Sequence, residues 1–246
     1  MPSKVAVLKF PGTNNDLDAI YALRDLVRLP SDLVWHTDFK ESSYAAAVIP
    51  GGFSYGDHLR AGIIAAHSPA MKEIRRMGQR GKPVIGICNG FQILTESGLL
   101  PGALLRNEQM SFVCKWVRLK VMTSRSVFTS RYIKGDVFPV PTNHGEGRYV
   151  VDEETLTRMY ENDQVLFKYA DSNGRETPEA NPNGSMQNIA GVCNEKGNVV
   201  GMMPHPERAS EKLLSPFHSD NAKLIFESLR DALRGEAAYE PVKRRA

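Results

Sequence analysis

Residues 84–91 read Val-Ile-Gly-Ile-Cys-Asn-Gly-Phe, an apolar run that ends in a cysteine between two glycines. Gly86 to Gly90 has the form G-x-C-x-G, a thiol version of the nucleophile elbow, in which a strand turns abruptly into a helix. The apex residue is then strained, and the glycines let strand and helix pass closely. A helix starting after Cys88 would also favour the thiolate through its dipole. A buried cysteine in a tight turn explains the pentapeptide equally well, so the rest of the chain has to decide.

Short apolar runs alternate with amphipathic stretches through the first hundred residues. We expect strands at residues 5–8, 33–35, 45–49 and 83–87. Apolar side chains at helical spacing predict helices that bury Leu17, Ile20, Leu23 and Val27 after the first strand, and Met71, Ile74 and Met77 between Ser68-Pro69 and Gly78 or Gly81. A third helix is expected from Asn89 to Ser97, with Gly98 as its stop. Alternation of this kind predicts an α/β fold, a mostly parallel sheet with helices on both faces.

The pattern changes after residue 105. Runs rich in β-branched and aromatic residues predict strands at residues 112–121, 137–140, 149–151 and 165–169, which we expect as antiparallel additions at one edge of the sheet. Residues 171–188 are expected to form a polar loop.

Towards the C-terminus, strands at residues 189–192 and 199–203 flank an expected hairpin turn, and a last helix over residues 219–234 stops at Gly235. We expect one domain over residues 1–234 and a solvated, mobile tail over residues 235–246.

The composition points to a globular enzyme of the cytoplasm. Hydrophobic residues make up 41% and charged residues 24% of the 246, and the net charge of +3 is too small to indicate nucleic acid. No apolar stretch reaches the length of a membrane span, and no signal segment is recognisable at the N-terminus. The three cysteines, Cys88, Cys114 and Cys193, are widely spaced and odd in number, which indicates a reducing compartment. We therefore expect neither nucleic acid nor membrane as a partner.

A second stretch with chemical potential is Met203-Pro204-His205-Pro206-Glu207. Met203 and His205 both precede prolines, which disfavours helix. Positions two apart in an extended segment point the same way, so His205 and Glu207 can project together, with the carboxylate fixing the imidazole tautomer. The ordinary alternative is a surface histidine beside a solvated acid. A lone cysteine followed by histidine and glutamate is compatible with an elbow-type triad.

A third stretch, Pro50-Gly51-Gly52, follows an expected strand. Its glycines leave backbone N–H groups free to face a developing oxyanion, although a plain turn would explain them in isolation. The N–H of Asn89, the residue after the cysteine, would complete the pair of donors.

Together these residues carry a resemblance. Gly86 to Gln92 with Pro204 to Glu207 resembles the class I (triad) glutamine amidotransferases, whose flavodoxin-like architecture is then expected. Four stretches resemble the glutaminase subunit of phosphoribosylformylglycinamidine synthase, the PurQ type: PGGFSYGDHLR (50–60), FVCKW (112–116), HGEGRY (144–149) and GMMPHPER (201–208). The resemblance runs from Phe10 to the last helix. It implies hydrolysis of L-glutamine to glutamate and ammonia, through a thioester on Cys88, for de novo purine biosynthesis.

The resemblance also implies a role for each site residue. It assigns Cys88, His205 and Glu207 to catalysis, the N–H groups of Gly52 and Asn89 to the oxyanion hole, and Gln92, Ser111 and Phe112 to substrate binding, with no metal.

The chain contains no phosphate-binding G-x-x-x-x-G-K-[ST] loop, so ammonia made here has no local acceptor. The resemblance implies a PurL-type synthetase partner, which holds ATP and Mg²⁺ and converts formylglycinamide ribonucleotide to formylglycinamidine ribonucleotide. A small PurS-type accessory subunit is also expected, and no cofactor in this chain. We expect the loops at residues 54–60 and 144–149 to face the synthetase.

Three other readings remain. A thiol hydrolase or stress-protein relative on the same scaffold would usually carry histidine directly after the cysteine, where Asn89 stands. A subunit used only for assembly would show a damaged triad. A glutaminase that serves another synthetase is the closest rival, and the purine-type stretches argue against it.

The sequence departs from the family pattern at two positions. Asn15 stands where many relatives carry cysteine, a change that puts no catalytic residue in doubt. Asn143 precedes His144 where a small residue is more usual, which leaves the contacts of that loop open.

Overall fold

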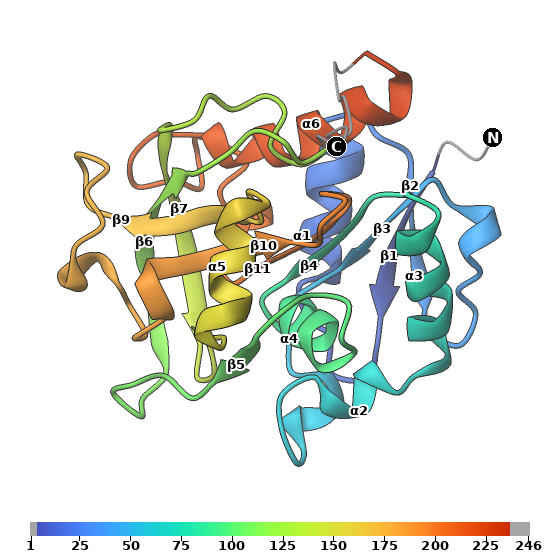
Figure 1. Cartoon of the computed structure of the whole chain (residues 1–246). Coiled ribbons are helices and arrows are strands. Elements are labelled where there is room, and N and C mark those ends of the chain that lie inside the picture. Colours follow the sequence, from blue (N-terminus) through green and yellow to red (C-terminus); the bar gives the residue numbers. More distant parts are fainter. Residues whose placement is uncertain (1–3, 237–246) are drawn as a thin grey trace.

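A computed structural model describes residues 4–236 and is built on a nine-stranded sheet (Figure 1). The strand order is β2-β1-β3-β4-β11-β10-β9-β6-β7. The parallel strands are β1 (Val5–Lys9), β2 (Ser31–Trp35), β3 (Ala46–Ile49), β4 (Val84–Ile87) and β11 (Val199–Met202); the antiparallel ones are β10 (Ile189–Cys193), β9 (Val165–Ala170), β6 (Val113–Val121) and β7 (Val137–His144). The predicted α/β sheet with antiparallel strands at one edge is confirmed.

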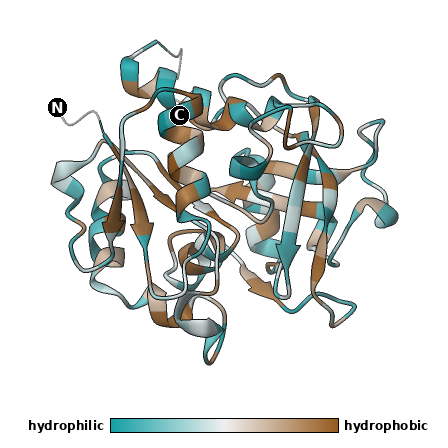
Figure 2. Ribbon diagram, turned by 180° about the vertical axis from the view of Figure 1, so that it is seen from behind, coloured by the Kyte–Doolittle hydropathy of each residue, from teal (hydrophilic) through white to brown (hydrophobic). Residues whose placement is uncertain are grey.

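The parallel half of the sheet is buried on both faces. Every residue of β3, β4 and β11 is buried, which is why these strands read as continuous apolar runs rather than alternating ones. The helix α1 (Asp16–Ile20) covers one face, while α3 (Pro69–Gln79) and α4 (Asn89–Glu96) cover the other (Figure 1). Figure 2 shows the strands of this half mostly in brown, the hydrophobic end of the scale. A short α2 (Ile63–Ala66) precedes α3.

The helix after β1 departs from the expected periodicity. Ile20, Leu23 and Val27 are buried as predicted, but Leu17 is 66% exposed. The reason is that α1 runs into a π-helical segment, Tyr21–Leu26, whose wider turn shifts the buried face. By contrast α3 follows its prediction: Ser68 caps it by accepting a hydrogen bond from the N–H of Ala70, and Pro69 occupies its first turn.

The antiparallel half brings distant loops together. In the β6–β7 pair Val113 lies opposite His144, which places the segment before β6 beside the segment after β7. The predicted strand around Tyr149 does not join this sheet. It forms β8 (Arg148–Val150), which pairs with β5 (Ala103–Leu105) in a separate two-stranded sheet. Local composition identified the strand but contained no information about its partner.

Helix α5 (Glu153–Glu161) was not predicted from the sequence. It buries only Leu156 and Met159, so its apolar stripe is weak, although Asp152 caps it by accepting from the N–H of Thr155. The last helix, α6 (Leu224–Arg234), starts later than expected because residues 221–223 form a 3₁₀ turn, and Gly235 ends it with φ +71°.

Residues 171–188 form a polar loop with two 3₁₀ turns, Pro178–Ala180 and Met186–Asn188. The predicted tail lies, from residue 237 onward, outside the described residues. Within residues 4–236 no helix is both long and apolar enough to cross a membrane.

Candidate active site

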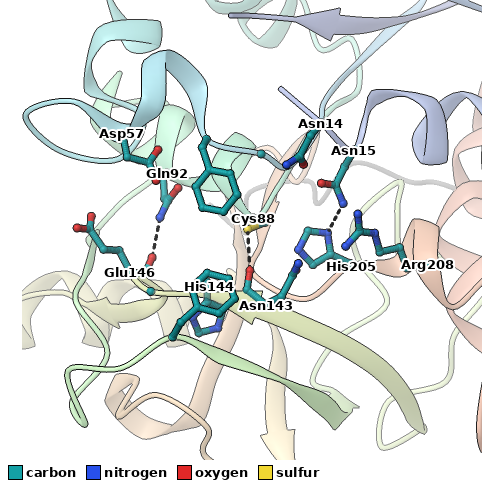
Figure 3. A pocket seen from close by; sticks show the side chains of 14 residues that line it. Asn14, Asn15, Asp57, Cys88, Gln92, Asn143, His144, Glu146, His205 and Arg208 are labelled. Carbon is teal, nitrogen blue, oxygen red and sulfur yellow. Dashed lines mark hydrogen bonds between the residues drawn. The ribbon is translucent and has the colours of Figure 1, made fainter. Parts of the chain in front are cut away.

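Three adjacent parallel strands end at the same edge of the sheet, and the segment after each one reaches one pocket. β3 leads into Gly51-Gly52, β4 into Cys88, and β11 through Met203-Pro204 into His205. The carboxyl ends of parallel strands are where open α/β sheets bind ligands. The pocket has a volume of about 200 Å³ (Figure 3). This is below the roughly 300–1,000 Å³ of sites for drug-sized ligands, so the pocket suits a small substrate.

Cys88 occupies the apex of the predicted elbow. Its backbone has φ +52° and ψ −107°, a conformation that residues other than glycine rarely adopt. The turn is so tight that a Cβ on Gly90 would overlap the carbonyl oxygen of Ile49, and one on Gly86 would overlap the backbone of Gly90. The Cys88 Sγ lies 3.7 Å from the backbone oxygen of Asn143. The backbone thus forms the strained strand-to-helix turn that an elbow requires.

His205 and Glu207 meet as predicted, by a different backbone route. His205 is extended (φ −104°, ψ 88°), but Pro206–Arg208 forms a 3₁₀ turn rather than continuing the extension. The turn still directs the Glu207 carboxylate back to the imidazole, where Oε1 lies 2.6 Å from Nδ1. Because a carboxylate only accepts, Nδ1 carries the proton. Nε2 makes no hydrogen bond within the described residues and remains available on the side of Cys88.

The environment of His205 favours the imidazolium. The ring is 1% exposed, and burial opposes protonation. The negative charges of Glu207 and Cys88 outweigh burial and raise the pKa of His205 to about 10. The resting site is therefore suited to an imidazolium beside a cysteine sulfur.

The two expected oxyanion donors come from the segments that follow two neighbouring strands, β3 and β4. Asn89 is the first residue of α4, where an N–H has no partner within the helix. Gly52 forms a β-bridge with Thr13, but the bonds of that bridge come from the neighbouring N–H groups of Asn14 and Phe53. Gly52 has φ +146°, and a Cβ there would lie 2.7 Å from the nitrogen of Asn14, so only glycine fits.

Of the three expected substrate residues, two line the pocket. Gln92 is buried and donates through Nε2 to the backbone oxygen of Glu146 at 2.6 Å, while its Oε1 accepts from Asn89. Phe112 also lines the pocket and is 54% exposed. Ser111 is not part of the pocket wall, and its backbone oxygen already accepts a bond from Asn107.

Asn107, which the sequence did not reveal, connects the segments around Ser111 and His144 through its side chain. Its side-chain nitrogen donates to the backbone oxygens of Ser111 (2.9 Å) and His144 (2.8 Å), and its oxygen accepts from Gly147 N and His144 Nδ1, each at 3.0 Å. Asn183 lies 3.4 Å from the other ring nitrogen of His144. An isolated buried asparagine carries no periodic signal, so the sequence alone did not reveal it.

His144 is the neutral counterpart of His205. Since the Asn107 oxygen only accepts, Nδ1 of His144 is protonated and Nε2 is left to accept from Asn183. Burial, and the charge of His205 next, lower the pKa of His144 to about 4. His144 therefore supports the loop as a neutral ring.

Two carboxylates lie at the Gln92 end of the pocket (Figure 3). Burial, and the proximity of Glu146, raise the pKa of Asp57 to about 6. These two carboxylates, Asp57 and Glu146, come from the loops at residues 54–60 and 144–149 that were expected to face the synthetase. Within residues 4–236, no group of three or more His, Cys, Asp or Glu side chains could hold a metal ion.

Asn15, one of the two departures from the family pattern, also belongs to the site, a placement that the sequence analysis did not predict. Its Nδ2 lies 3.2 Å from His205 Nδ1 and 3.2 Å from Glu207 Oε1. A signal existed: Asn15 follows β1, a parallel strand beside β3, and polar residues at such strand ends commonly reach the site. At the second departure, Asn143, the backbone oxygen contacts Cys88 and the side chain lines the pocket.

Comparisons with known proteins identify the family. The chain matches the CobB/CobQ-like glutamine amidotransferase domain family over residues 2–231. It is 56% identical over 228 residues to the "Phosphoribosylformylglycinamidine synthase subunit PurQ" of Aquifex aeolicus, covering 93% of this chain and 100% of the relative. The protein of the same name from Methanosarcina mazei is 50% identical over 228 residues, covering 93% of this chain and 97% of that protein.

Among solved structures, a chain of "Structure of PurLQS from Thermotoga maritima" superposes with a TM-score of 0.82 at 41% identity. The match covers 95% of this chain and 100% of that one.

Proposed function

Because the chain belongs to the glutamine amidotransferase family, in its PurQ branch, we propose that it is the glutaminase subunit of a phosphoribosylformylglycinamidine synthase. It hydrolyses L-glutamine to glutamate and ammonia for de novo purine biosynthesis. The observation that carries the proposal is the convergence, in one pocket, of Cys88 on its strained elbow and the buried His205–Glu207 pair.

In the first half of the reaction the Cys88 sulfur bonds to the side-chain amide carbon of glutamine. The carbonyl electron pair moves onto oxygen, where the N–H groups of Gly52 and Asn89 donate to it; losing one such donor typically costs about 100- to 1,000-fold in rate. Collapse of this intermediate breaks the carbon–nitrogen bond. The His205 imidazolium gives its proton to the nitrogen, which leaves as ammonia, and a γ-glutamyl thioester remains on Cys88.

In the second half water replaces ammonia. Neutral His205 takes a proton from the water while the oxygen attacks the thioester carbon, and the carbon–sulfur bond breaks to release glutamate. Glu207 keeps Nδ1 protonated throughout, so Nε2 is the nitrogen that exchanges the proton. Gln92, with the segment of Ser111 and Phe112, is assigned to the amino-acid end of the substrate.

The ammonia is used by partners. A PurL-type synthetase, with ATP and Mg²⁺ on its own chain, amidates formylglycinamide ribonucleotide, and a PurS-type accessory subunit completes the complex. Supporting this, the matched Thermotoga maritima structure is described as PurLQS. The two loops that carry Asp57 and Glu146 lie at one end of the pocket and are assigned to face the synthetase.

The remaining assignments follow from the same role. We assign the catalytic unit to residues 1–234 as one domain, without a cofactor of its own. The reaction is placed in the cytoplasm, in keeping with free thiols at Cys88, Cys114 and Cys193.

The test is reconstitution with the synthetase and accessory subunit. The complex should form formylglycinamidine ribonucleotide from either glutamine or ammonium salts, and with Cys88→Ala it should use ammonium alone. Glutamine-dependent product from the Cys88→Ala complex would refute the nucleophile. Capture of a different ATP-dependent synthetase from the native source, with none of the PurL type, would favour the rival assignment.

Chemical labelling tests the same nucleophile independently. A glutamine-like electrophile should modify Cys88 and spare Cys193, because burial raises the pKa of Cys193 to about 12. Cys114 is exposed but lies outside the pocket, so it should react with iodoacetamide and not with the substrate analogue. Preferential modification of Cys114 or Cys193 by the analogue, read by peptide mass spectrometry, would contradict the assignment.

A further inference from the structure

Asn15 makes close contact with both members of the His205–Glu207 pair. Its Nδ2 lies 3.2 Å from each of His205 Nδ1 and Glu207 Oε1, and the asparagine is 2% exposed. Since His205 Nδ1 already carries a proton directed at Glu207, it cannot accept a second one. The hydrogen bond from Asn15 therefore goes to the carboxylate, which receives two donors on the same oxygen.

Asn15 does not perform the capping role that is typical of its position. It stands at the N-cap of α1, where an asparagine side chain ordinarily accepts from an N–H of the first turn, yet it makes no such bond. Its backbone is fixed instead, by its N–H to the Gly51 oxygen at 3.2 Å and by its own oxygen to the N–H of Ala19 at 3.1 Å. The side chain is thereby turned away from its helix and towards the catalytic pair.

We propose that Asn15 is a positioning residue that holds the Glu207 carboxylate and withdraws part of its negative charge from His205, so that the histidine can act as a base in thioester hydrolysis. This inference rests on the proposed glutaminase function and deepens it. A hydrogen bond to a charged acceptor stabilises the charge where it stands, which weakens what that charge does for a third group.

The effect should be largest in the second half-reaction. In the resting site both Cys88 and Glu207 favour the imidazolium. Once Cys88 is acylated its charge is gone, and Glu207 is the anion that remains in contact with the ring. Among the other titratable groups that line the pocket, His144 is neutral in the working range. Asp57 and Glu146 lie at the Gln92 end of the pocket (Figure 3), and Arg208 is paired with Asp18 through a 3.0 Å bond. Asn15 then controls how strongly the remaining carboxylate retains the proton on His205.

The experiment compares Asn15→Leu, which keeps the branched shape without a donor, with Asn15→Asp, which adds a negative charge. In the assembled complex, the acid limb of the kcat profile should move to higher pH by about 0.5–1 unit for the leucine variant and about 1–3 units for the aspartate variant. Leu17→Asn, at an exposed position of the same helix, is the matched control and should not shift the profile.

Two further measurements separate this role from a structural one. In a Cys88→Ala background, which mimics loss of the thiolate, NMR titration of His205 should show the same upward order: native Asn15, then Leu, then Asp. In a Glu207→Gln background the Asn15→Leu shift should disappear, because the charge on which Asn15 acts is absent. A uniform loss of kcat without a shift in pH, or an undiminished shift beside Glu207→Gln, would overturn the inference.

Failure of the underlying function is distinguishable from failure of this inference. If the native complex does not release glutamate from glutamine, the proposed function is wrong. If the native complex is active and the Asn15 variants share its pH profile and its His205 titration, only the role of Asn15 is wrong.

Discussion

The two walls of the pocket each carry a buried histidine, and the two histidines have opposite properties. The wall formed by the ends of the parallel strands contains His205, whose pKa is raised to about 10. The wall formed by the loops of the antiparallel strands contains His144, whose pKa is lowered to about 4. Both rings are almost fully buried, at 1% and 2% exposure, so burial alone does not distinguish them.

The neighbours make the difference. His205 donates to a carboxylate and lies beside a sulfur, whereas His144 donates to the neutral amide oxygen of Asn107 and accepts from the amide nitrogen of Asn183. A charged partner stabilises the imidazolium, and amide partners stabilise the neutral ring. The wall formed by the parallel strand ends, here the parallel wall, is therefore suited to proton transfer. The wall formed by the loops of the antiparallel strands, the antiparallel wall, keeps the shape of the pocket. The following predictions test this division, starting with the largest effect.

Cys88→Ala should lower glutamine hydrolysis by more than about 10⁴-fold, because the covalent route is lost. Unfolding in urea should change little, since the substitution removes one sulfur and leaves the elbow intact. Cys114→Ala, on the exposed side of β6, should keep full activity. Appreciable glutaminase activity in the Cys88→Ala protein would show that the parallel wall does not supply the nucleophile.

His205→Ala should approach the Cys88→Ala loss, whereas Glu207→Gln should be milder by about 10- to 100-fold. Glutamine keeps an acceptor for His205 Nδ1 but lacks the charge, so the ring stays oriented and the pKa of His205 falls towards its ordinary value. Steady-state glutamate release in the complex measures both. Equal losses for the two variants would mean that Glu207 does more than orient and charge the histidine.

On the antiparallel wall, Asn107→Ala should destabilise the protein by about 2–4 kcal/mol, because several buried groups lose their partner at once. Its effect on catalysis should appear in KM more than in kcat, as this wall holds substrate rather than moving protons. Gln109→Ala, which removes a single partly buried bond to the backbone oxygen of Pro182, is the control and should change both much less. A fall in kcat with an unchanged KM would contradict the prediction that the antiparallel wall holds substrate and takes no part in proton transfer.

The smallest effect concerns pH and stability. The unfolded chain binds a proton at His144 more readily than the folded one, so lowering the pH from 6.5 to 5 should cost about 2 kcal/mol of unfolding free energy from this residue. His205 has the opposite sign: its contribution is present below pH 6.5 and is lost as the pH rises towards 10. The free energy of unfolding, measured in urea at pH 5 and pH 7, should depend less on pH in the His144→Gln variant than in the native protein. If the unfolding free energy of that variant changed with pH as much as that of the native protein, His144 would not titrate as described.

Local pattern accounts for most of what could be predicted. The elbow at Cys88, the strands before it and after it, and the helix that starts at Ser68 all follow from periodicity, glycine positions and capping within a few residues. His205 and Glu207 were found because they are two residues apart, even though a 3₁₀ turn rather than an extended strand joins them. Each of these features depends on interactions between neighbours in the chain, which a sequence displays directly.

The features that were missed depend on contacts between distant residues. The partner of β8 and the support of the His144 loop by Asn107 arise from register and packing that no short window contains. Asn15 shows this most clearly, because it meets Glu207 across 192 positions of chain. The sequence places a cysteine, a histidine and a glutamate at strand ends, but the strand order and the packing of β1 against β3 bring Asn15 to them. The charge on His205 is set by these neighbours in space, since electrostatic interactions depend on distance between atoms and not on separation along the chain.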